Sequence, residues 1–324
     1  MKKVSTVKVF LGAIAMAASS LTFAQPYPNH AISMITPFPP GGAADVVLRL
    51  IAERLTESFK SPVVVENKGG AGGAIGTAFV ARAAPDGYTL LLTSSSTMSI
   101  NPQLRAQPPY DPFKDFTPIA LVGTSPNVLV VNSSLPINSV SDLIAAAKKQ
   151  PGGLNFASNG IGTLSHLTGE LFEQTADIEM LHVPYKGAAP AVADTAGGQV
   201  AALFAAYASV APMVESKKLR ALGVTSAKRI SVAPDLPTIA ESGLSGFESN
   251  QWWGIWGPAG LPESIVSKIN TEVNKVLQDP EVKKRFAQES VELTGGTPQE
   301  LTDYLRTDYD KWTAVIKAAG IKAE

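Results

Sequence analysis

Residues 32–42 read ISMITPFPPGG, a short apolar run followed by a loop of prolines and glycines. The apolar run at residues 32–36 predicts a buried β-strand. Apolar residues then recur at helical spacing after the loop: Val46, Val47, Leu50, Ile51 and Leu55. A strand, a tight loop and a helix in this order form the repeating unit of α/β proteins, so this stretch indicates the fold class.

The rest of the chain repeats the same alternation. Short β-branched or apolar runs predict further strands at residues 63–65, 88–92, 128–131, 155–158, 198–204 and 219–224. Helical spacing predicts helices at residues 139–149, 262–278 and 298–319. The last two begin at prolines, which the first turn of a helix tolerates. We therefore expect an α/β fold throughout.

The N-terminus has the three parts of a secretory signal peptide. Lys2 and Lys3 give a positive start, residues 9–18 are apolar, and Thr22 and Ala24 are small residues where a signal peptidase cuts. The alternative is an uncleaved membrane anchor, for which the apolar run is too short. We expect residues 1–24 to be removed and the mature chain to be exported to the periplasm.

The mature chain, about 300 residues long, is long enough for two domains. We expect two lobes joined by two chain crossings, near residues 123–125 and 247–249. Lobe 1 would then contain residues 25–124 plus 249–324, and lobe 2 would contain residues 125–248. Small ligands commonly bind in the cleft between two such lobes.

Composition limits the partners. The formal net charge is −1 and charged residues make up 17%, which argues against nucleic acid and against a polybasic membrane contact. With 0 Cys, the chain can form no disulfide and lacks the cysteine to which a lipid anchor is attached. After the first residues no apolar stretch is long enough for membrane insertion. We expect a free, monomeric protein.

The motifs of enzymes and cofactor sites are missing. There is no Gly-x-Ser-x-Gly elbow, and the 3 His, dispersed in the sequence and without cysteine, do not predict a zinc site. The glycine run at residues 69–76 fails the dinucleotide spacing because Ile75 stands where a glycine is needed. We expect no enzyme, no cofactor and no metal. A secreted hydrolase stays open as an alternative because catalytic triads are spatial.

The loop after the first strand is a candidate anion-binding site. Phe38, Pro40, Gly41 and Gly42 precede the expected helix, whose first amides are unpaired and whose dipole favours negative charge. Glycines also let the backbone approach a ligand closely. The alternative is an ordinary tight turn. Asp45, in the first turn of the helix, would repel an anion, so we interpret it as a brace for the loop.

A similar loop follows the expected strand at residues 155–158. Ser158, Asn159, Gly160 and Thr163 combine glycine freedom with polar donors in front of a helix. The alternative is that Thr163 only caps that helix.

Two further features lie near predicted strands. Ser94 and Ser95 belong to a polar cluster that ends the strand at residues 88–92, and they are further candidate ligand contacts. Trp252, Trp253 and Trp256 predict core or hinge packing, because aromatic side chains dominate protein cores.

Seven segments resemble the Bug family, the substrate-binding receptors of tripartite tricarboxylate transporters. They are residues 37–45 (PFPPGGAAD), 64–73 (VVENKGGAGG), 85–91 (PDGYTLL), 183–187 (VPYKG), 219–225 (LRALGVT), 237–243 (PTIAESG) and 258–262 (PAGLP). They occur in order from the first mature strand to the last helices, which makes chance matching improbable.

The resemblance implies a two-lobed periplasmic binding protein of type II, the Venus flytrap fold. It implies a ligand carboxylate held by main-chain amides of the loop at residues 38–42 and of the loop before Thr163, partly through water. Tyr185, in a matched segment, joins the candidate ligand-binding residues. The implied partners are a large multi-spanning and a small membrane subunit of a transporter. Some relatives serve sensing, so a ligand-presenting subunit of a sensory system is the alternative.

One departure from the family pattern concerns the ligand. Many relatives carry an acidic residue where this chain has Ala205, which is followed by Ala206. An acid at this position pairs with a ligand amine, whereas alanine makes an apolar wall. We therefore expect a small organic carboxylate without an amine, either a dicarboxylate or an aromatic acid.

The predicted signal peptide gives a first test. Because the signal peptidase site ends at Ala24, the protein purified from its native host is expected to begin at Gln25 and to appear in periplasmic extracts. N-terminal sequencing measures this directly. An intact Met1 on a cytoplasmic protein would contradict it.

Overall fold

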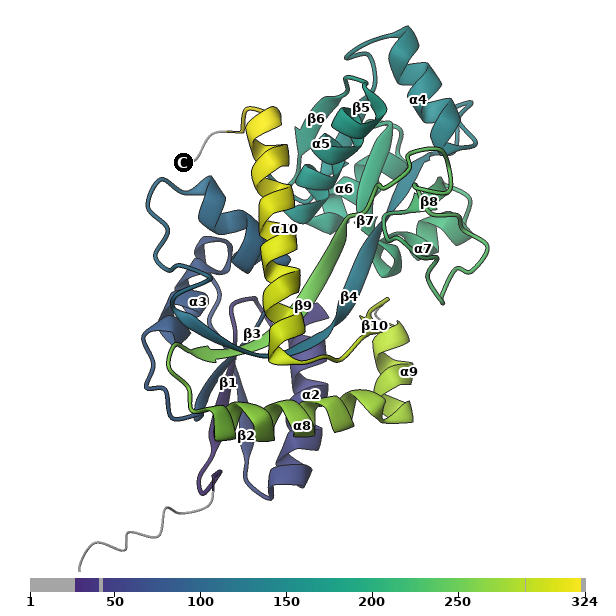
Figure 1. Ribbon diagram of the computed structural model, residues 1–324. Coiled ribbons are helices and arrows are strands. Elements are labelled where there is room, and N and C mark those ends of the chain that lie inside the picture. Colours follow the sequence, from purple (N-terminus) through teal and green to yellow (C-terminus); the bar gives the residue numbers. More distant parts are fainter. Residues whose placement is uncertain (1–26, 41–42, 289, 322–324) are drawn as a thin grey trace, which may run out of the picture.

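The chain forms two lobes in a computed structural model that describes residues 27–40, 43–288 and 290–321 (Figure 1). The predicted α/β, two-lobed fold is confirmed. A path of hydrogen-bonded strands, β2-β1-β3-β9-β4-β7-β5-β6, runs through both lobes, and β8 and β10 pair with β4 beside that path. The predicted signal peptide at residues 1–24 lies outside the described residues.

Lobe 1 is built on three parallel strands: β1 (Ile32–Thr36), β2 (Val63–Asn67) and β3 (Thr89–Ser94). The antiparallel β9 (Asn250–Pro258) lies beside β3. The side chains of β1 alternate between two cores. Met34 packs with α2 (Ala43–Phe59) and α8 (Glu263–Gln278), whereas Ile35 packs on the other face with α3 (Ala74–Ala81). Helices therefore cover both faces of the sheet.

Lobe 2 repeats this plan. The strands β5 (Asn155–Ser158), β6 (Leu181–Pro184) and β7 (Ala202–Ala206) are parallel, and β8 (Leu219–Val224) pairs antiparallel with β4. The helices around them are α4 (Val140–Lys149), α5 (Leu164–Ala176), α6 (Ala188–Ala196) and α7 (Tyr207–Glu215).

The strand β4 (Phe116–Asn132) is 17 residues long and belongs to both lobes. It pairs with β9 as far as Pro126 and, from Asn127 onward, with β7 and β8. The chain returns to lobe 1 at the start of β9. These two passages lie close to the expected crossings, and the domain bounds given above stay a prediction.

The long helix α10 (Pro298–Ala318) lies against both lobes (Figure 1, yellow). It begins with a capping box, in which the Thr297 hydroxyl accepts from Glu300 N–H and the Glu300 carboxylate accepts from Thr297 N–H. At its other end Trp312 packs against Leu164 and Leu167 of α5 and against Ile100 of lobe 1. Apolar packing therefore joins the lobes a third time.

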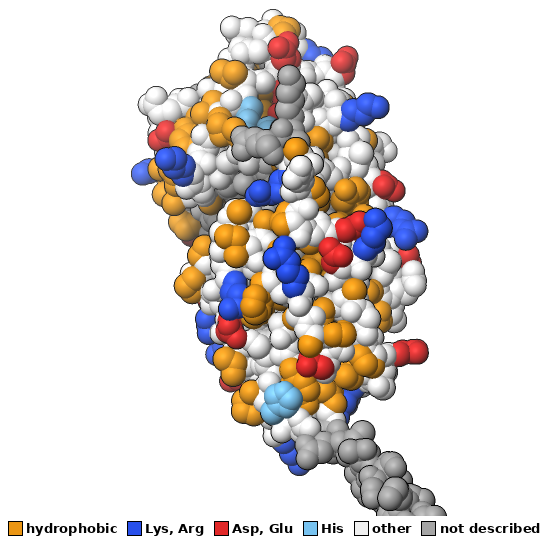
Figure 2. Space-filling view, turned by 90° about the vertical axis from the view of Figure 1, so that its left-hand side faces the viewer, with side chains coloured by type: hydrophobic (Ala, Val, Ile, Leu, Met, Phe, Trp, Pro, Cys, Tyr) orange, Lys and Arg blue, Asp and Glu red, His pale blue; other side chains and the backbone are white. Residues whose placement is uncertain are grey.

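Short elements complete the described chain: η1 (Ala71–Gly73), η2 (Ser96–Ile100), η3 (Asn101–Leu104), α9 (Pro280–Gln288) and β10 (Glu292–Leu293). Within the described residues, no helix has both the length and the apolar character needed to cross a bilayer. The face shown in Figure 2 carries basic and acidic side chains interspersed with apolar ones rather than one basic patch.

The packing of α10 predicts a large stability effect. Trp312 is fully buried, so Trp312→Ala is expected to lower the free energy of unfolding by about 3–5 kcal/mol, the range for removing a large aromatic side chain from a core. Urea unfolding measures this. The exposed Arg306→Ala on the same helix is the control, with a change within about 0.5 kcal/mol. Equal stability of the two variants would show that α10 is not a structural connection.

Candidate functional site

A cavity of about 550 Å³ lies between the two lobes. The residues that line it are Phe38, Pro39, Pro40, Ser125, Asn127, Asn159, Gly187, Ala188, Ala206, Gln251 and Trp253. Those from lobe 1 include the loop after β1, and those from lobe 2 lie at or just after the ends of β5, β6 and β7. Open α/β sheets bind ligands at the carboxyl ends of their strands, so the cavity has the expected position for a ligand.

A second cavity, of about 570 Å³, lies beside α10 and the start of β9. Its lining includes four carboxylates, those of Glu248, Glu300, Asp303 and Asp308. These carboxylates would repel an anionic ligand, and the cavity is not at the ends of the parallel strands. We therefore take the inter-lobe cavity as the candidate site.

The lobe 1 wall is held in shape by a polar network. The side-chain amide of Asn67 donates to the carbonyl of Phe38 at 3.1 Å and to the carboxylate of Asp45 at 2.8 Å. Asp45, which is buried, is also paired with Arg49 at 3.0 Å. Asp45 thus contacts the loop through Asn67, and Arg49 offsets its charge. The position of Asp45 agrees with the brace that its place in the sequence suggests.

The phenyl ring of Phe38 packs edge-on against Trp253, with ring centroids 6.2 Å apart. This contact seats the loop on β9. Gly41 and Gly42, the predicted carboxylate-binding glycines, lie outside the described residues. Their role stays a prediction.

The lobe 2 wall offers a side chain rather than free backbone. The N–H of Asn159 donates to the Ser165 hydroxyl at 3.0 Å, and its carbonyl accepts from the N–H of Gly187 at 3.1 Å. The side-chain oxygen of Asn159 is buried and has no hydrogen-bond partner among the described residues. Asn159 therefore has an unused polar atom beside the cavity.

The expected use of the other amides of this loop is not what the structure shows. The N–H of Gly160 donates to the Ser158 hydroxyl at 3.2 Å, and the N–H of Gly162 donates to Nδ1 of His166 at 3.2 Å. The Thr163 hydroxyl donates to the Gly160 carbonyl at 2.7 Å and caps α5. Ser158, Gly160 and Thr163 thus shape the loop, because short polar side chains find nearby backbone partners first.

Tyr185 and Ala205 also lie away from the cavity lining. The Tyr185 hydroxyl donates to Asp194 at 2.8 Å, and burial followed by this contact raises its pKa to about 12. Ala205 is fully buried in an apolar cluster with Val128, whereas its neighbour Ala206 lines the cavity. The apolar wall expected from these alanines is therefore provided by Ala206.

Ser94 and Ser95 are fully buried behind the cavity. Both hydroxyls are without a hydrogen-bond partner among the described residues, and Ser94 is paired in register with Trp253. They do not line the cavity themselves. As unpaired donors next to a lining strand, they stay candidates for polar contacts.

Sequence reasoning missed the contribution of β9. Neighbouring residues of a strand face opposite sides, and here the indole N–H of Trp252 donates to Asp308 at 2.8 Å, whereas Trp253 lines the cavity. The indole N–H of Trp253 is buried and finds no partner in the part of the chain that the structure describes. Strand alternation is the signal that separates the two tryptophans, but assigning their faces requires the fold.

The cavity wall is electrically neutral. None of the lining residues is charged, within the part of the chain that the structure describes. A bound ion of either sign would lack a counter-charge in this lining and would be held by uncharged polar side chains and backbone dipoles. Such a site favours binding and lacks the paired groups of acid–base chemistry.

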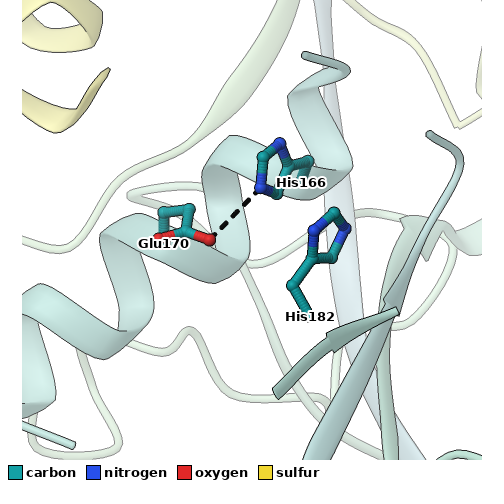
Figure 3. Close-up of side chains that lie close together, drawn as sticks. All are labelled: His166, Glu170 and His182. Atoms are coloured by element: carbon teal, nitrogen blue, oxygen red, sulfur yellow. Dashed lines mark ion pairs between the residues drawn. The ribbon is translucent and has the colours of Figure 1, made fainter. Parts of the chain in front are cut away.

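Two histidines that are far apart in the sequence meet behind this wall. His166 of α5 and His182 of β6 lie beside Glu170, and ligand atoms of the three residues lie within 4.8 Å of one another (Figure 3). They are the one group of this kind found in the described residues. In the sequence these histidines are dispersed, because the fold alone brings β6 against α5.

Comparison with known proteins agrees with the geometry. Residues 47–321 match the model of the tripartite tricarboxylate transporter family receptor. The protein BugT of Bordetella pertussis is 37% identical over 319 residues, which cover 98% of this chain and 97% of BugT.

Two solved structures with bound ligands are similar over the whole fold. Rpa4515 of R. palustris with adipate has a TM-score of 0.80 and 35% identity, covering 91% of this chain and 99% of that one. MatC of Rhodopseudomonas palustris with bound malate has a TM-score of 0.74 and 30% identity, covering 90% and 100%. The family consists of solute-binding receptors and not of enzymes. The chain therefore belongs to the receptor family of the tripartite tricarboxylate transporters.

Proposed function

We propose that this chain is a periplasmic receptor that binds a small dicarboxylate in the inter-lobe cavity and delivers it to a tripartite tricarboxylate-type transporter. The observation that carries the proposal is the neutral cavity wall with an unpaired buried donor at a lining residue, Trp253 Nε1, among the described residues. A buried donor without a partner costs free energy, so a ligand that accepts its hydrogen bond gains that free energy on binding.

The wall chemistry favours a dicarboxylate over an amino acid. An ammonium group enclosed between Ala206, Gly187 and Trp253 would lose its hydration without gaining a counter-charge. A carboxylate gains no counter-charge either, but the unpaired indole N–H of Trp253 can donate to it. Two structural relatives are described with adipate and with malate, both dicarboxylates without an amine.

The proposed delivery of the ligand to a transporter is supported by the family and not by the cavity. Receptors of this family are named for a transporter, and the proposed partners are its large multi-spanning and small membrane subunits. The alternative, presentation of the ligand to a sensory system, uses the same cavity. Both functions require that the cavity bind the ligand, and a ligand panel tests that requirement.

A ligand panel tests the proposal. Adipate or malate is expected to raise the melting temperature, because a ligand that binds only the folded state stabilises it by mass action. Calorimetry is expected to give a weaker affinity for glutamate and aspartate, and benzoate tests the aromatic alternative. Preference for either amino acid would show that an anionic group outside the described lining is present, and would overturn the dicarboxylate assignment.

A tryptophan pair gives a sharper test of the carboxylate contact. Trp253→Phe keeps the ring packing but removes the indole N–H, and is expected to weaken binding of the best carboxylate by about 1.5–3 kcal/mol, the worth of a hydrogen bond to a charged group. Calorimetry measures the change.

The matched control is Trp256→Phe. Trp256 lies on the same strand and its indole N–H is also buried without a partner, but it is not a lining residue. Its affinity is expected to equal that of the wild type. If both variants bind equally well, Trp253 does not contact the ligand.

A further inference from the structure

His166, Glu170 and His182 form a compact cluster in lobe 2 (Figure 3). Nε2 of His166 lies 3.2 Å from the carboxylate of Glu170, one turn away on α5. The rings of His166 and His182 stack with centroids 3.9 Å apart and an interplanar angle of 12°. His166 is buried and His182 is half-buried, so the cluster is largely shielded from solvent.

The cluster is bonded to both parts of the loop at residues 158–163. Nδ1 of His166 accepts from the N–H of Gly162 at 3.2 Å. Nε2 of His182 is hydrogen-bonded to the Ser158 hydroxyl at 2.7 Å, and that hydroxyl accepts from the N–H of Gly160. Asn159, between these contacts, lines the cavity. The two imidazoles therefore support the loop from behind.

These contacts indicate which ring nitrogen of a neutral His166 carries the proton. Gly162 donates, so Nδ1 must be the unprotonated acceptor, and the proton of the neutral ring is on Nε2, facing Glu170. A metal ion on Nε2 would move that proton to Nδ1, against the Gly162 N–H. The lone pair of a ring nitrogen lies in the plane of its ring, and the two stacked rings lie in separate, nearly parallel planes. One metal ion bound by both rings would have to lie in both planes at once. The arrangement fits a proton rather than a metal.

We propose that His166 and His182 are positioning residues that hold the Asn159 loop in its ligand-binding shape, and that the loop keeps this shape only while His182 is neutral. Protonation of His182 places a cation on the face of the stacked His166 ring, in a half-buried position. This releases the loop. The change in loop conformation does not depend on the proposed function, whereas the change in ligand affinity rests on it.

The charges around the cluster set the direction of the pH dependence. Burial and, to a smaller extent, the neighbouring His166 lower the pKa of His182 to about 4, and Glu170 opposes the shift. The folded loop thus binds fewer protons than the released loop between the ordinary pKa of about 6.5 and pH 4. Loop order is present above pH 6.5 and is lost as the pH falls toward 4.

Glu173, on the next turn of α5, contributes a pH dependence of stability with the opposite sign. Burial first, with Glu170 and Glu179 adding to it, raises the Glu173 pKa to about 7. A carboxyl group whose pKa is raised favours the folded state at low pH and disfavours it as the pH rises. The histidine effect must therefore be isolated with histidine variants.

Hydrogen–deuterium exchange of the peptide covering residues 156–167 tests the proposal without any ligand. In the wild type, exchange corrected for the intrinsic rate is expected to be faster at pH 5.5 than at pH 7.5. His182→Gln, which keeps a neutral polar group near Ser158, is expected to reduce this difference. His30→Gln is the control, because His30 is exposed and stacks on Tyr88 in lobe 1.

Two variants at one position separate the loop contact from the Glu170 contact. His166→Asn keeps an acceptor near the position of Nδ1, and His166→Gln keeps a donor near Nε2 but loses the acceptor for Gly162. The Gly162 amide is expected to exchange about ten-fold faster in His166→Gln than in His166→Asn, the factor for one lost hydrogen bond. Adipate and malate affinities are expected to fall in the same order.

Three outcomes would overturn the proposal: pH-independent loop exchange in the wild type, equal exchange in the two His166 variants, or protection of the loop by equimolar Zn²⁺. Absence of adipate and malate binding with the expected exchange pattern would refute the proposed ligand class and leave the positioning role intact.

Discussion

The continuity of β4 is the constraint on which the rest of the structure depends. One strand supplies hydrogen-bonding edges to β9 in lobe 1 and to β7 and β8 in lobe 2, so the two sheets cannot separate without breaking a ladder. Where the strand passes from one lobe to the other, Pro126 has no N–H to donate to the ladder. Directly after it, the Asn127 N–H donates to the buried Thr225 hydroxyl, which donates to the Ser249 carbonyl. The two crossings are thus tied together at one short segment.

The cavity lies at that segment. Ser125 and Asn127 of β4 and Gln251 of β9 line it, so part of the wall belongs to the crossings themselves. A rotation of the lobes about these residues changes the distance between Phe38 on one side and Asn159 on the other. A ligand that contacts both walls therefore favours a closed arrangement, which is the physical basis of hinge closure. The packing of Trp312 against α5 and Ile100 limits how far the lobes open.

The sequence predicted the strand that begins at residue 32, the helix that follows it and α10, because periodicity and proline positions report burial and helix starts directly. It predicted side-chain roles less well. Thr163 and Ser158 are the residue types that bind anions, but here local backbone groups use their hydroxyls. Trp253 and the His166–His182 stack depend on which strands become neighbours, and a pattern within one segment carries no information about that.

A neutral cavity is suited to a receptor that must release what it binds. Burying a carboxylate against Arg or Lys requires both ions to lose their hydration, and the resulting pair is difficult to separate. Hydrogen bonds from neutral donors, the role proposed for Trp253 Nε1, are individually weaker and can be broken one at a time. Specificity then depends on shape and on keeping the wall in one conformation, because no single charge dominates. Two hydrogen bonds behind Asn159 keep the lobe 2 wall in one conformation, one between Gly162 and His166 and one between Ser158 and His182. Asn67 and Asp45 do the same for the lobe 1 wall. Affinity in such a site is governed as much by what braces the loops as by what contacts the ligand.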